Sequence, residues 1–375
     1  MTDGSPLRWD TYFMARDAGF DEFWRQFLDC SERRLLYILG NGSDPRMCLG
    51  VEHVLEAGAA GRLHVMLLTC DEGSSSLSQE HNRGVEINVE GLRSLLDGRA
   101  TLETRSISMW AHDGTSRRRT SSVESARLIS SSQLDEYTDV VIDIGALPRS
   151  VYLSLIGRLM YLSREHRTTG RLNLHVIVAE DSSLDRDIIA VGIDENADYV
   201  YGFGGGLDLE SSGETPTVFM PILGEGQRDQ LIAIYGRVTP EEICPILPFP
   251  SRDPRRGDNL IVEYRELLFD QWRIEPRNII YASELNPFDA YRQICRAALR
   301  YDQVLQPLGG CKIALAALSS KLISLGALLS AYDLHCRGLC VGLADVEAEG
   351  YILPEKGGRY SPSLFSLWLV GECYV

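Results

Sequence analysis

The chain lacks the cysteine spacing of a disulfide-stapled or zinc-binding protein. Its nine cysteines are scattered over 375 residues, and several lie inside apolar stretches. The densest group, His335, Cys336 and Cys340, has no fourth ligand at the spacing that a tetrahedral zinc site requires. The opening residues, MTDGSPLRWD, also lack the charged and apolar segments of a secretory signal. We therefore expect reduced, buried thiols and a cytoplasmic protein.

Positive charge is also scarce. The chain has 53 acidic and 37 basic residues, which gives a formal net charge of −16. A phosphate backbone would be repelled overall, so this balance argues against a broad nucleic-acid-binding surface. Two short basic stretches, residues 117–119 and 251–258, are more typical of solvated loops than of a binding patch.

A long apolar run without charge is absent too. The most apolar stretch, residues 313–332, has the length of a membrane span, but Lys321 lies near its centre beside Ser319 and Ser320. A charge at that position would be costly in lipid, whereas a buried strand, a turn and a helix accommodate the same pattern. We therefore expect no membrane partner.

What the sequence does contain is a series of nearly continuous apolar runs separated by amphipathic stretches. The first four strand-like runs are residues 34–40, 62–70, 138–146 and 172–180, and the pattern continues without an obvious internal repeat. Such strands are buried on both faces of a parallel sheet, and the helices between them cover those faces. The sequence thus predicts an α/β protein with a doubly wound, mainly parallel, Rossmann-like sheet, in two parts.

The opening segment, residues 1–30, is rich in aromatic side chains. Four of them match helical spacing: Phe20, Phe23, Trp24 and Phe27. We interpret the segment as an aromatic helical arm that packs on the main domain, and the alternative is a helix that binds a protein partner. After it we expect a Rossmann-like nucleotide-binding domain over residues 31–245 and a second Rossmann-like α/β domain over residues 246–375.

Acidic residues follow several of the expected strands, at the edge where ligands bind in an open parallel sheet. Among them are Asp143, Glu180 and Asp181. One interpretation is helix capping, in which these side chains accept the free N–H groups of the next helix. The other is an acidic rim for a ribose or a metal-bound phosphate. In an enzyme, these three residues would be catalytic and would hold a metal ion such as Mg²⁺ or activate water.

The loop after the first strand, GNGSDPR at residues 40–46, points most clearly to a ligand. Gly40 and Gly42 allow close backbone approach and would offer N–H groups at a helix N-terminus to an anion. The loop lacks the third glycine of a dinucleotide fingerprint and the lysine of a P-loop. The alternative is a tight strand-to-helix turn that binds nothing.

The side chains of this loop suit a nucleotide. Asn41 can hydrogen-bond a sugar or a base, and Asp44 can cap the helix or take a ribose hydroxyl. Arg46 can meet a phosphate. Together with Ser43, these residues form the expected ligand-binding set of the first domain.

The same loop resembles the GNGFD signature that opens the AbiH-like abortive-infection proteins of bacteria, where it also follows a first strand. Four residues match, Gly40, Asn41, Gly42 and Asp44, and Ser43 replaces the usual Phe. The resemblance covers residues 36–47. It implies a role in bacterial defence against phage.

A second stretch, residues 311–329, is similar to the ligand loop of CARF-type Rossmann sensors, which bind cyclic oligonucleotides. Ser319, Ser320 and Lys321 stand where a Gly/Thr-rich turn with a lysine is expected. The similarity implies that Lys321 offers a point charge to a phosphate. The alternative is a solvated lysine at the start of a helix.

Two functions remain open from the sequence. The first is a nucleotide-binding protein of a bacterial anti-phage defence system, acting as a sensor or as a nucleotide-processing effector, with or without Mg²⁺. The second is a non-catalytic interaction subunit of a multiprotein defence complex, with a partner bound through residues 1–30.

Overall fold

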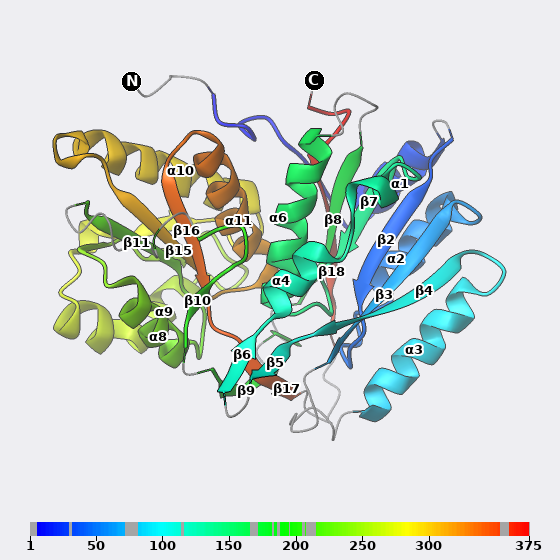
Figure 1. Cartoon of the computed structure of the whole chain (residues 1–375), viewed down its shortest axis with the longest axis horizontal. Helices are drawn as coiled ribbons and strands as arrows, with labels where there is room; N and C mark the ends of the chain where they lie inside the picture. Colours follow the sequence, from blue (N-terminus) through cyan, green and yellow to red (C-terminus); the bar gives the residue numbers. More distant parts are fainter. Residues whose placement is uncertain are drawn as a thin grey trace. The chain divides into compact units, whose positions relative to one another are not determined.

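The computed structural model describes residues 6–29, 32–71, 82–113, 116–165, 172–181, 184–185, 188–194, 196–204, 207, 215–352 and 360–374. Within it the chain forms two compact units, each with its own sheet (Figure 1). The larger unit comprises Tyr12–Gly192 and Ala348–Val375, and the smaller unit comprises Met1–Thr11 and Ile193–Glu347. The α/β architecture in two parts is therefore as the sequence predicts.

The units do not coincide with the expected division at residues 30 and 245. The chain passes between them after Thr11, after Gly192 and again after Glu347. Residue 245 lies inside the smaller unit, between two strands of one sheet, β12 (Glu242–Ile243) and β13 (Ile246–Pro248). The expected boundary at residue 245 therefore lies within one unit and does not separate domains.

The larger unit is built on a seven-stranded sheet in the order β1-β18-β8-β7-β2-β3-β4. The strands are β1 (Phe13–Arg16), β2 (Leu35–Gly40), β3 (Leu63–Asp71), β4 (Thr101–Ser108), β7 (Asp139–Asp143), β8 (Asn173–Glu180) and β18 (Ser363–Val370). β4, β3, β2, β7 and β8 are parallel, and β18 is antiparallel to both β8 and β1. The order reverses between β2 and β7, which is the topological switch point of this sheet.

Helices cover both faces of this sheet. They are α1 (Ala18–Asp29), α2 (Leu49–Val54) continued by the π-helical turn η1 (Leu55–Ala59), α3 (Asn82–Leu96), α4 (Ser121–Arg127), α5 (Ser131–Leu134) and α6 (Arg149–Glu165). One core cluster joins α1, α2 and α3 to alternate residues of β2, among them Leu35, Tyr37 and Leu39. α4 and α6 contact each other, and no residue of either belongs to that cluster, so they cover the other face (Figure 1). The strands are continuous apolar runs because they are buried from both sides.

The aromatic residues of the opening segment lie inside the units. Phe20 and Trp24 on α1 are fully buried in the core of the larger unit. Trp9 is also fully buried, in the smaller unit, where its ring lies 5.2 Å from that of Tyr291 and 6.1 Å from that of Tyr332. The helix of the segment therefore packs on the larger unit, as the sequence predicts, whereas Trp9 belongs to the smaller unit. These rings are not available to a protein partner.

The smaller unit has a second mainly parallel sheet, in the order β10-β16-β15-β11-β13-β14, with β12 paired to β11. Its other strands are β10 (Asp198–Tyr199), β11 (Thr217–Ile222), β14 (Ile280–Ala282), β15 (Lys312–Ala317) and β16 (Cys340–Asp345). β10 is antiparallel to β16, and the remaining pairs are parallel. The order reverses between β11 and β15.

Helices cover this sheet on two faces as well. They are α8 (Arg228–Val238), α9 (Arg256–Arg265) with the π-helical turn η5 (Glu266–Gln271), α10 (Pro287–Val304) and α11 (Lys321–Cys336), with short 3₁₀ turns η6 (Pro276–Asn278) and η7 (Gln306–Leu308). α8, α9 and η5 share one core cluster with the strands, whereas α10 and α11 contact each other. The apolar stretch 313–332 is thus a strand, a turn and a helix. In the described part of the chain, no helix combines the length and the apolar character needed to cross a membrane.

Two short pairs of strands complete the structure. β5 (Trp110–Asp113) pairs antiparallel with β6 (Ser116–Arg119), and β9 (Ile189–Ile193) pairs with β17 (Ala348–Ile352). The sequence pattern of residues 183–193 predicts a helix, but its apolar part, Ile189–Ile193, forms β9. The partner strand is more than 150 residues away in the sequence, so its pairing overrides the local pattern.

Candidate functional site

The loop after β2 lies at the switch point of the larger unit. Gly40, the last residue of β2, lies against the backbone of the loop after β7. A β-carbon built on Gly40 would be 2.6 Å from the carbonyl oxygen of Ala146, so only glycine fits there. Gly42 is less confined, since its β-carbon would be 3.4 Å from that of Ala146. The two loops therefore meet where ligands bind in sheets of this order.

The loop does not lead directly into a helix. Residues 42–48 form bends and turns, and α2 begins only at Leu49. Pro45 is therefore not a first helical residue, and α2 is six residues long. An anion site on helical N–H groups beside Gly40, as the sequence suggests, has no basis in this geometry.

Asp44 and Arg46 form a buried ion pair with each other. The Arg46 guanidinium donates to Asp44 Oδ1 (3.0 Å) and Oδ2 (2.8 Å), and it also donates to the carbonyl oxygen of Ala179 (3.1 Å). Asp185 lies 2.8 Å from the same guanidinium. Only 4% of the Arg46 side chain is exposed. The pair holds the loop against the end of β8. We therefore give Asp44 and Arg46 a structural role instead of the ligand contacts expected from the sequence.

The electrostatics of this pair favour its charged form. Burial by itself lowers the pKa of Arg46, but its hydrogen bonds to Asp44 and the charge of Asp185 outweigh burial and raise that pKa above its ordinary value. The guanidinium thus stays charged and fully engaged. A phosphate would have to displace a carboxylate to reach it.

The side chain of Asn41 keeps unused hydrogen-bonding capacity. Its backbone N–H donates to Leu68 O (2.7 Å), and its Nδ2 donates to Thr69 Oγ1 (3.4 Å). Its Oδ1 is buried and accepts no hydrogen bond from the described residues. Asn41, Gly42 and Ser43 are themselves only half-buried. An acceptor without a donor costs free energy, so this oxygen is a natural partner for an N–H or O–H group of a ligand.

Asn88 is a supporting residue that the sequence does not reveal. It lies on α3, and its Nδ2 donates to the carbonyl oxygens of Gly42 (2.8 Å) and Asp44 (2.9 Å). These bonds fix the path of the loop from the outside. No local signal could indicate this, because Asn88 is far from the loop in the sequence.

Asp143, at the end of β7, is fully engaged inside the larger unit. Its Oδ2 accepts from the hydroxyl of Tyr37 (2.8 Å), and its Oδ1 accepts from the backbone N–H of Gly145 (2.9 Å). Burial raises the pKa of Tyr37 well above its ordinary value, and the charge of Asp143 adds to the effect. Burial, followed by the same carboxylate, raises the pKa of Cys48 to about 11. Asp143 thus fixes the turn after β7, as a capping role implies.

Glu180, the last residue of β8, and Asp181, which follows it, are both buried. Asp181 Oδ1 accepts from the N–H of Leu184 (3.2 Å), and its Oδ2 accepts from the N–H of Ser361 (2.6 Å). Asp181 therefore ties two loops together. Over the residues that the structure describes, no three His, Cys, Asp or Glu side chains are grouped so that they could hold a metal ion. The expected acidic rim for Mg²⁺ is not assembled there.

Ser319, Ser320 and Lys321 belong to the smaller unit, at its own switch point between β11 and β15. Ser320 is the residue before α11, yet its side chain makes no capping hydrogen bond. Ser319 Oγ lies 3.5 Å from Arg256 Nη2. These three residues are thus in a different unit from the Gly40–Arg46 loop, at an equivalent place in a second sheet.

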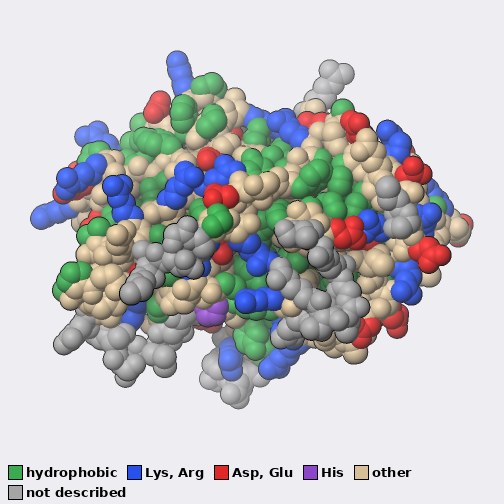
Figure 2. Space-filling view, turned by 90° about the horizontal axis from the view of Figure 1, so that it is seen from above, with side chains coloured by type: hydrophobic (Ala, Val, Ile, Leu, Met, Phe, Trp, Pro, Cys, Tyr) green, Lys and Arg blue, Asp and Glu red, His purple; other side chains and the backbone are tan. Residues whose placement is uncertain are grey.

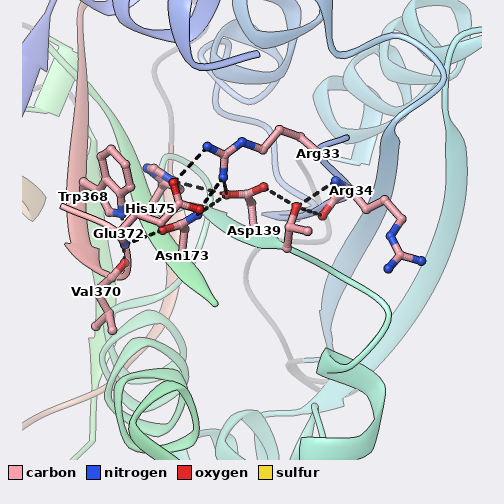
Figure 3. Close-up of polar contacts among 9 residues, drawn as sticks. Arg33, Arg34, Asp139, Asn173, His175, Trp368, Val370 and Glu372 are labelled. Carbon is pink, nitrogen blue, oxygen red and sulfur yellow. Dashed lines mark hydrogen bonds and ion pairs between the residues drawn. The ribbon is translucent and has the colours of Figure 1, made fainter. Parts of the chain in front are cut away.

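A separate polar cluster lies at the opposite edge of the larger sheet, where β7 and β8 begin (Figure 3). Asp139 accepts from Asn173 Nδ2 (2.7 Å) and from Arg33 Nη1 (3.4 Å). Arg33 also donates to both carboxylate oxygens of Glu372, at 2.9 Å and 3.0 Å. The cluster joins Arg33, two residues before β2, to the first residues of β7 and β8 and to the segment after β18. It holds the sheet together, away from the ligand edge.

His175 lies next to this cluster, completely buried among aromatic rings (Figure 3). The rings of Trp24, Phe27 and Trp368 have centroids 5.0–5.1 Å from that of His175. Neither ring nitrogen has a hydrogen-bond partner among the described residues. Burial, and secondly the charge of Arg33, lower the pKa of His175 to about 3. It is a neutral core residue, as its position in a strand predicts.

The face displayed in Figure 2 is not uniformly acidic. Basic and acidic side chains are mixed there with hydrophobic ones, although the chain carries a net charge of −16.

Comparison with known proteins gives no family. No family model and no curated protein matches the chain. Among solved structures, it is similar to a protein described as a universal stress protein from Pseudomonas aeruginosa UCBPP-PA14, at 11% identity over 83% of this chain and 92% of that chain, with a TM-score of 0.23. A universal stress protein from Archaeoglobus fulgidus DSM 4304 matches at 9% identity over 82% and 94% of the two chains, with a TM-score of 0.22. Scores this low carry no argument about function.

Proposed function

We propose that this protein binds a nucleotide-like small molecule at the Gly40–Ser43 loop of the larger unit and acts as a sensor or as a nucleotide-processing effector. The observation that carries the proposal is the buried Oδ1 of Asn41, which lies at the switch point and accepts no hydrogen bond from the described residues. A nucleoside offers N–H and O–H donors to such an oxygen. The tight contact of Gly40 with Ala146 and the half-buried state of Gly42 and Ser43 favour the approach of a ligand to backbone.

The binding role is better supported than a catalytic one. Asp143 and Asp181 are two of the three expected catalytic carboxylates. Both accept hydrogen bonds from groups of the larger unit itself. Asp44 and Arg46 neutralise each other. The ligand would therefore be held mainly by backbone groups and by the Asn41 amide, and the sensor function needs no further group.

The test uses thermal unfolding in the presence of nucleosides and of nucleoside mono-, di- and triphosphates. A ligand at a hundred times its dissociation constant stabilises the folded protein by about 2.7 kcal/mol. Gly42→Ala is the matched variant, because its β-carbon makes only an ordinary contact in the free protein but would occupy the face that a ligand approaches. We expect ligand-dependent stabilisation of the wild type and its loss in Gly42→Ala at unchanged basal stability. Equal stabilisation of both proteins, or of neither, would refute the site.

The setting in bacterial anti-phage defence is proposed from the likeness of the Gly40–Asp44 loop to the AbiH-like signature. It is tested by plating phage on bacteria that express the wild type or Gly42→Ala. Fewer plaques with the wild type alone would support it, and equal plating on both strains would count against it. The alternative of an interaction subunit loses its expected surface, since Phe20, Trp24 and Trp9 are buried within the units.

A further inference from the structure

The five parallel strands of each sheet have the same order, when β12 and β13, which pair with the same side of β11, are counted as one interrupted strand. Read across the sheet, the larger unit has β8-β7-β2-β3-β4, and the smaller unit has β16-β15-β11-β13-β14. In both, the first parallel strand along the chain lies in the centre, the second and third follow on one side, and the fourth and fifth on the other. In both, the fifth strand also pairs with an antiparallel strand, which is β18, late in the chain, in the larger unit and β10, before the parallel strands, in the smaller unit. The two units thus share the topology of their parallel strands.

A short sequence is repeated at the matching point of both sheets. The central strands end in Ile-Leu-Gly-x-Gly, at residues 38–42 in the larger unit and at residues 222–226 in the smaller unit. The first glycine has the same task in both, since a β-carbon on Gly40 would meet the carbonyl oxygen of Ala146, and one on Gly224 would meet that of Leu318 even more closely. Ala146 and Leu318 both lie in the loop after the fourth strand. The sequence shows no obvious long repeat, yet the two units share this short motif at matching positions.

The ends of the fifth strands match as well. Glu180 ends β8 and Asp181 follows it, and Asp345 ends β16 and Glu347 lies two residues further on. All four carboxylates are buried. Buried acids are uncommon unless a structure needs them, so their recurrence at one position supports the equivalence of the two units.

We infer that the smaller unit carries a second ligand-binding site, formed by the Gly224–Gly226 loop and the Ser319–Lys321 turn. This is the place in the second sheet that corresponds to the Gly40–Ser43 loop, between the strands where the order reverses. The Ser319–Lys321 turn belongs to the smaller unit, whereas the first site is in the larger unit. A second site would give this turn a ligand-binding role of its own.

Polar side chains line this second place. Glu225 stands where the larger unit has Asn41, and its carboxylate accepts two hydrogen bonds of 2.7 Å from Arg256. Arg256 also donates to Glu284 at 2.6 Å. The Oγ of Ser320 is buried and makes no hydrogen bond to any described residue. As in the first site, a buried side-chain oxygen is thus left for a donor from outside the chain.

The chemistry favours a sugar over a phosphate. Two carboxylates surround the single guanidinium of Arg256, so an added phosphate would meet repulsion from both of them. The hydroxyl groups of a ribose can donate to Ser320 Oγ and to the partly exposed carboxylate of Glu225. We therefore assign to this site a ribonucleoside, a class that rests on the proposed function of the first site.

Isothermal titration of the full chain with adenosine, guanosine, cytidine and uridine, each separately, tests the inference. We expect one of them to bind with a stoichiometry of two per chain. Ser320→Ala should retain one equivalent and weaken the second about tenfold, since it removes one hydrogen bond. Its thermal unfolding should be unchanged, because the hydroxyl has no partner to lose among the described residues.

Two comparisons make the result specific. Ser330→Ala is the control, because Ser330 lies on the same helix but its hydroxyl is bonded to Gly326 O at 2.7 Å, so its removal should leave both equivalents. Gly42→Ala should remove only the equivalent that Ser320→Ala retains.

A stoichiometry of one that is lost in Gly42→Ala and untouched by Ser320→Ala would overturn the second site while the first stands. Absence of ribonucleoside binding would overturn the second site as well, and the proposed function would then depend on the phosphate-bearing ligands of the thermal screen.

Discussion

The α-carbon of Gly40 faces the carbonyl oxygen of Ala146 so closely that a β-carbon on Gly40 would lie 2.6 Å from that oxygen. This contact sets the distance between the loops after β2 and β7, which meet at the candidate site. Gly40 and Ala146 touch through backbone atoms, so neither can relieve a clash by changing a side-chain rotamer.

We predict that Gly40→Ala destabilises the protein by about 1–3 kcal/mol, because the added methyl forces the backbone apart. Gly91→Ala is the control, since Gly91 lies in α3 with nothing within 4 Å of its β-carbon position. The control should gain about 0.5–1 kcal/mol from reduced chain entropy in the unfolded state. Urea unfolding of both variants measures the effect, and equal stability of the two would contradict the contact.

Replacing Arg46 by Met should destabilise the protein by about 3–5 kcal/mol, because it leaves the buried carboxylate of Asp44 without its partner. The control is Arg228→Met, which removes an exposed pair with Glu266 and should cost less than about 1 kcal/mol. Thermal unfolding at neutral pH distinguishes them. A fully stable Arg46→Met protein would show that Arg46 is free for a ligand after all.

Stability should fall as the pH is lowered below the ordinary histidine pKa of about 6.5, because His175 stays neutral in the folded state down to a pKa of about 3. Between these values the unfolded chain binds a proton that the folded chain does not, which lowers the free energy of unfolding by about 1.4 kcal/mol per pH unit for this group. Asp139, 3.9 Å away, opposes this trend, since burial raises its pKa and its contribution is lost as the pH rises.

His175→Leu isolates the effect, because Arg33, Asp139 and Glu372 remain in place. The variant should be more stable than the wild type, and its advantage should grow from pH 7 towards pH 4.5. Urea unfolding at several pH values gives the difference directly. A constant difference across this range would mean that His175 can be protonated in the folded protein.

Trp9→Ala should destabilise the smaller unit by about 3–5 kcal/mol, as expected for the loss of a fully buried indole. The half-exposed Tyr281 of the same unit serves as the control, and Tyr281→Ala should have a small effect. Tryptophan fluorescence and circular dichroism during urea unfolding report the change. An unaltered unfolding midpoint in Trp9→Ala would show that the Trp9 indole does not contribute to the core of the smaller unit.

The sequence reveals the parallel strands because burial on both faces leaves a continuous apolar run, as in Leu35–Gly40. It does not reveal β9, since Ile189–Ile193 pairs with a strand that follows the whole smaller unit. For the same reason it does not show that Trp9 and Trp24 belong to different units. Local patterns carry no information on such long-range pairing.

The candidate site shows the same limit. The glycines of the Gly40–Gly42 loop are recognisable because their freedom is a local property. The role of Arg46 depends on its contacts with Ala179 and Asp185, and a local sequence pattern does not show that these residues lie beside it. The Ile-Leu-Gly-x-Gly repeat is only five residues long. It indicates related loops only because both copies lie at the end of the central strand of a sheet with the same order of parallel strands.

The course of the chain has a consequence for its synthesis. β18, which pairs with both β8 and β1, is synthesised only after all of the smaller unit. The edge of β8 therefore has no partner strand while the smaller unit is being made, and β1 has none either. Nascent chains halted before Ser363 would expose this edge to other chains, so chaperone demand should persist until β18 has been synthesised.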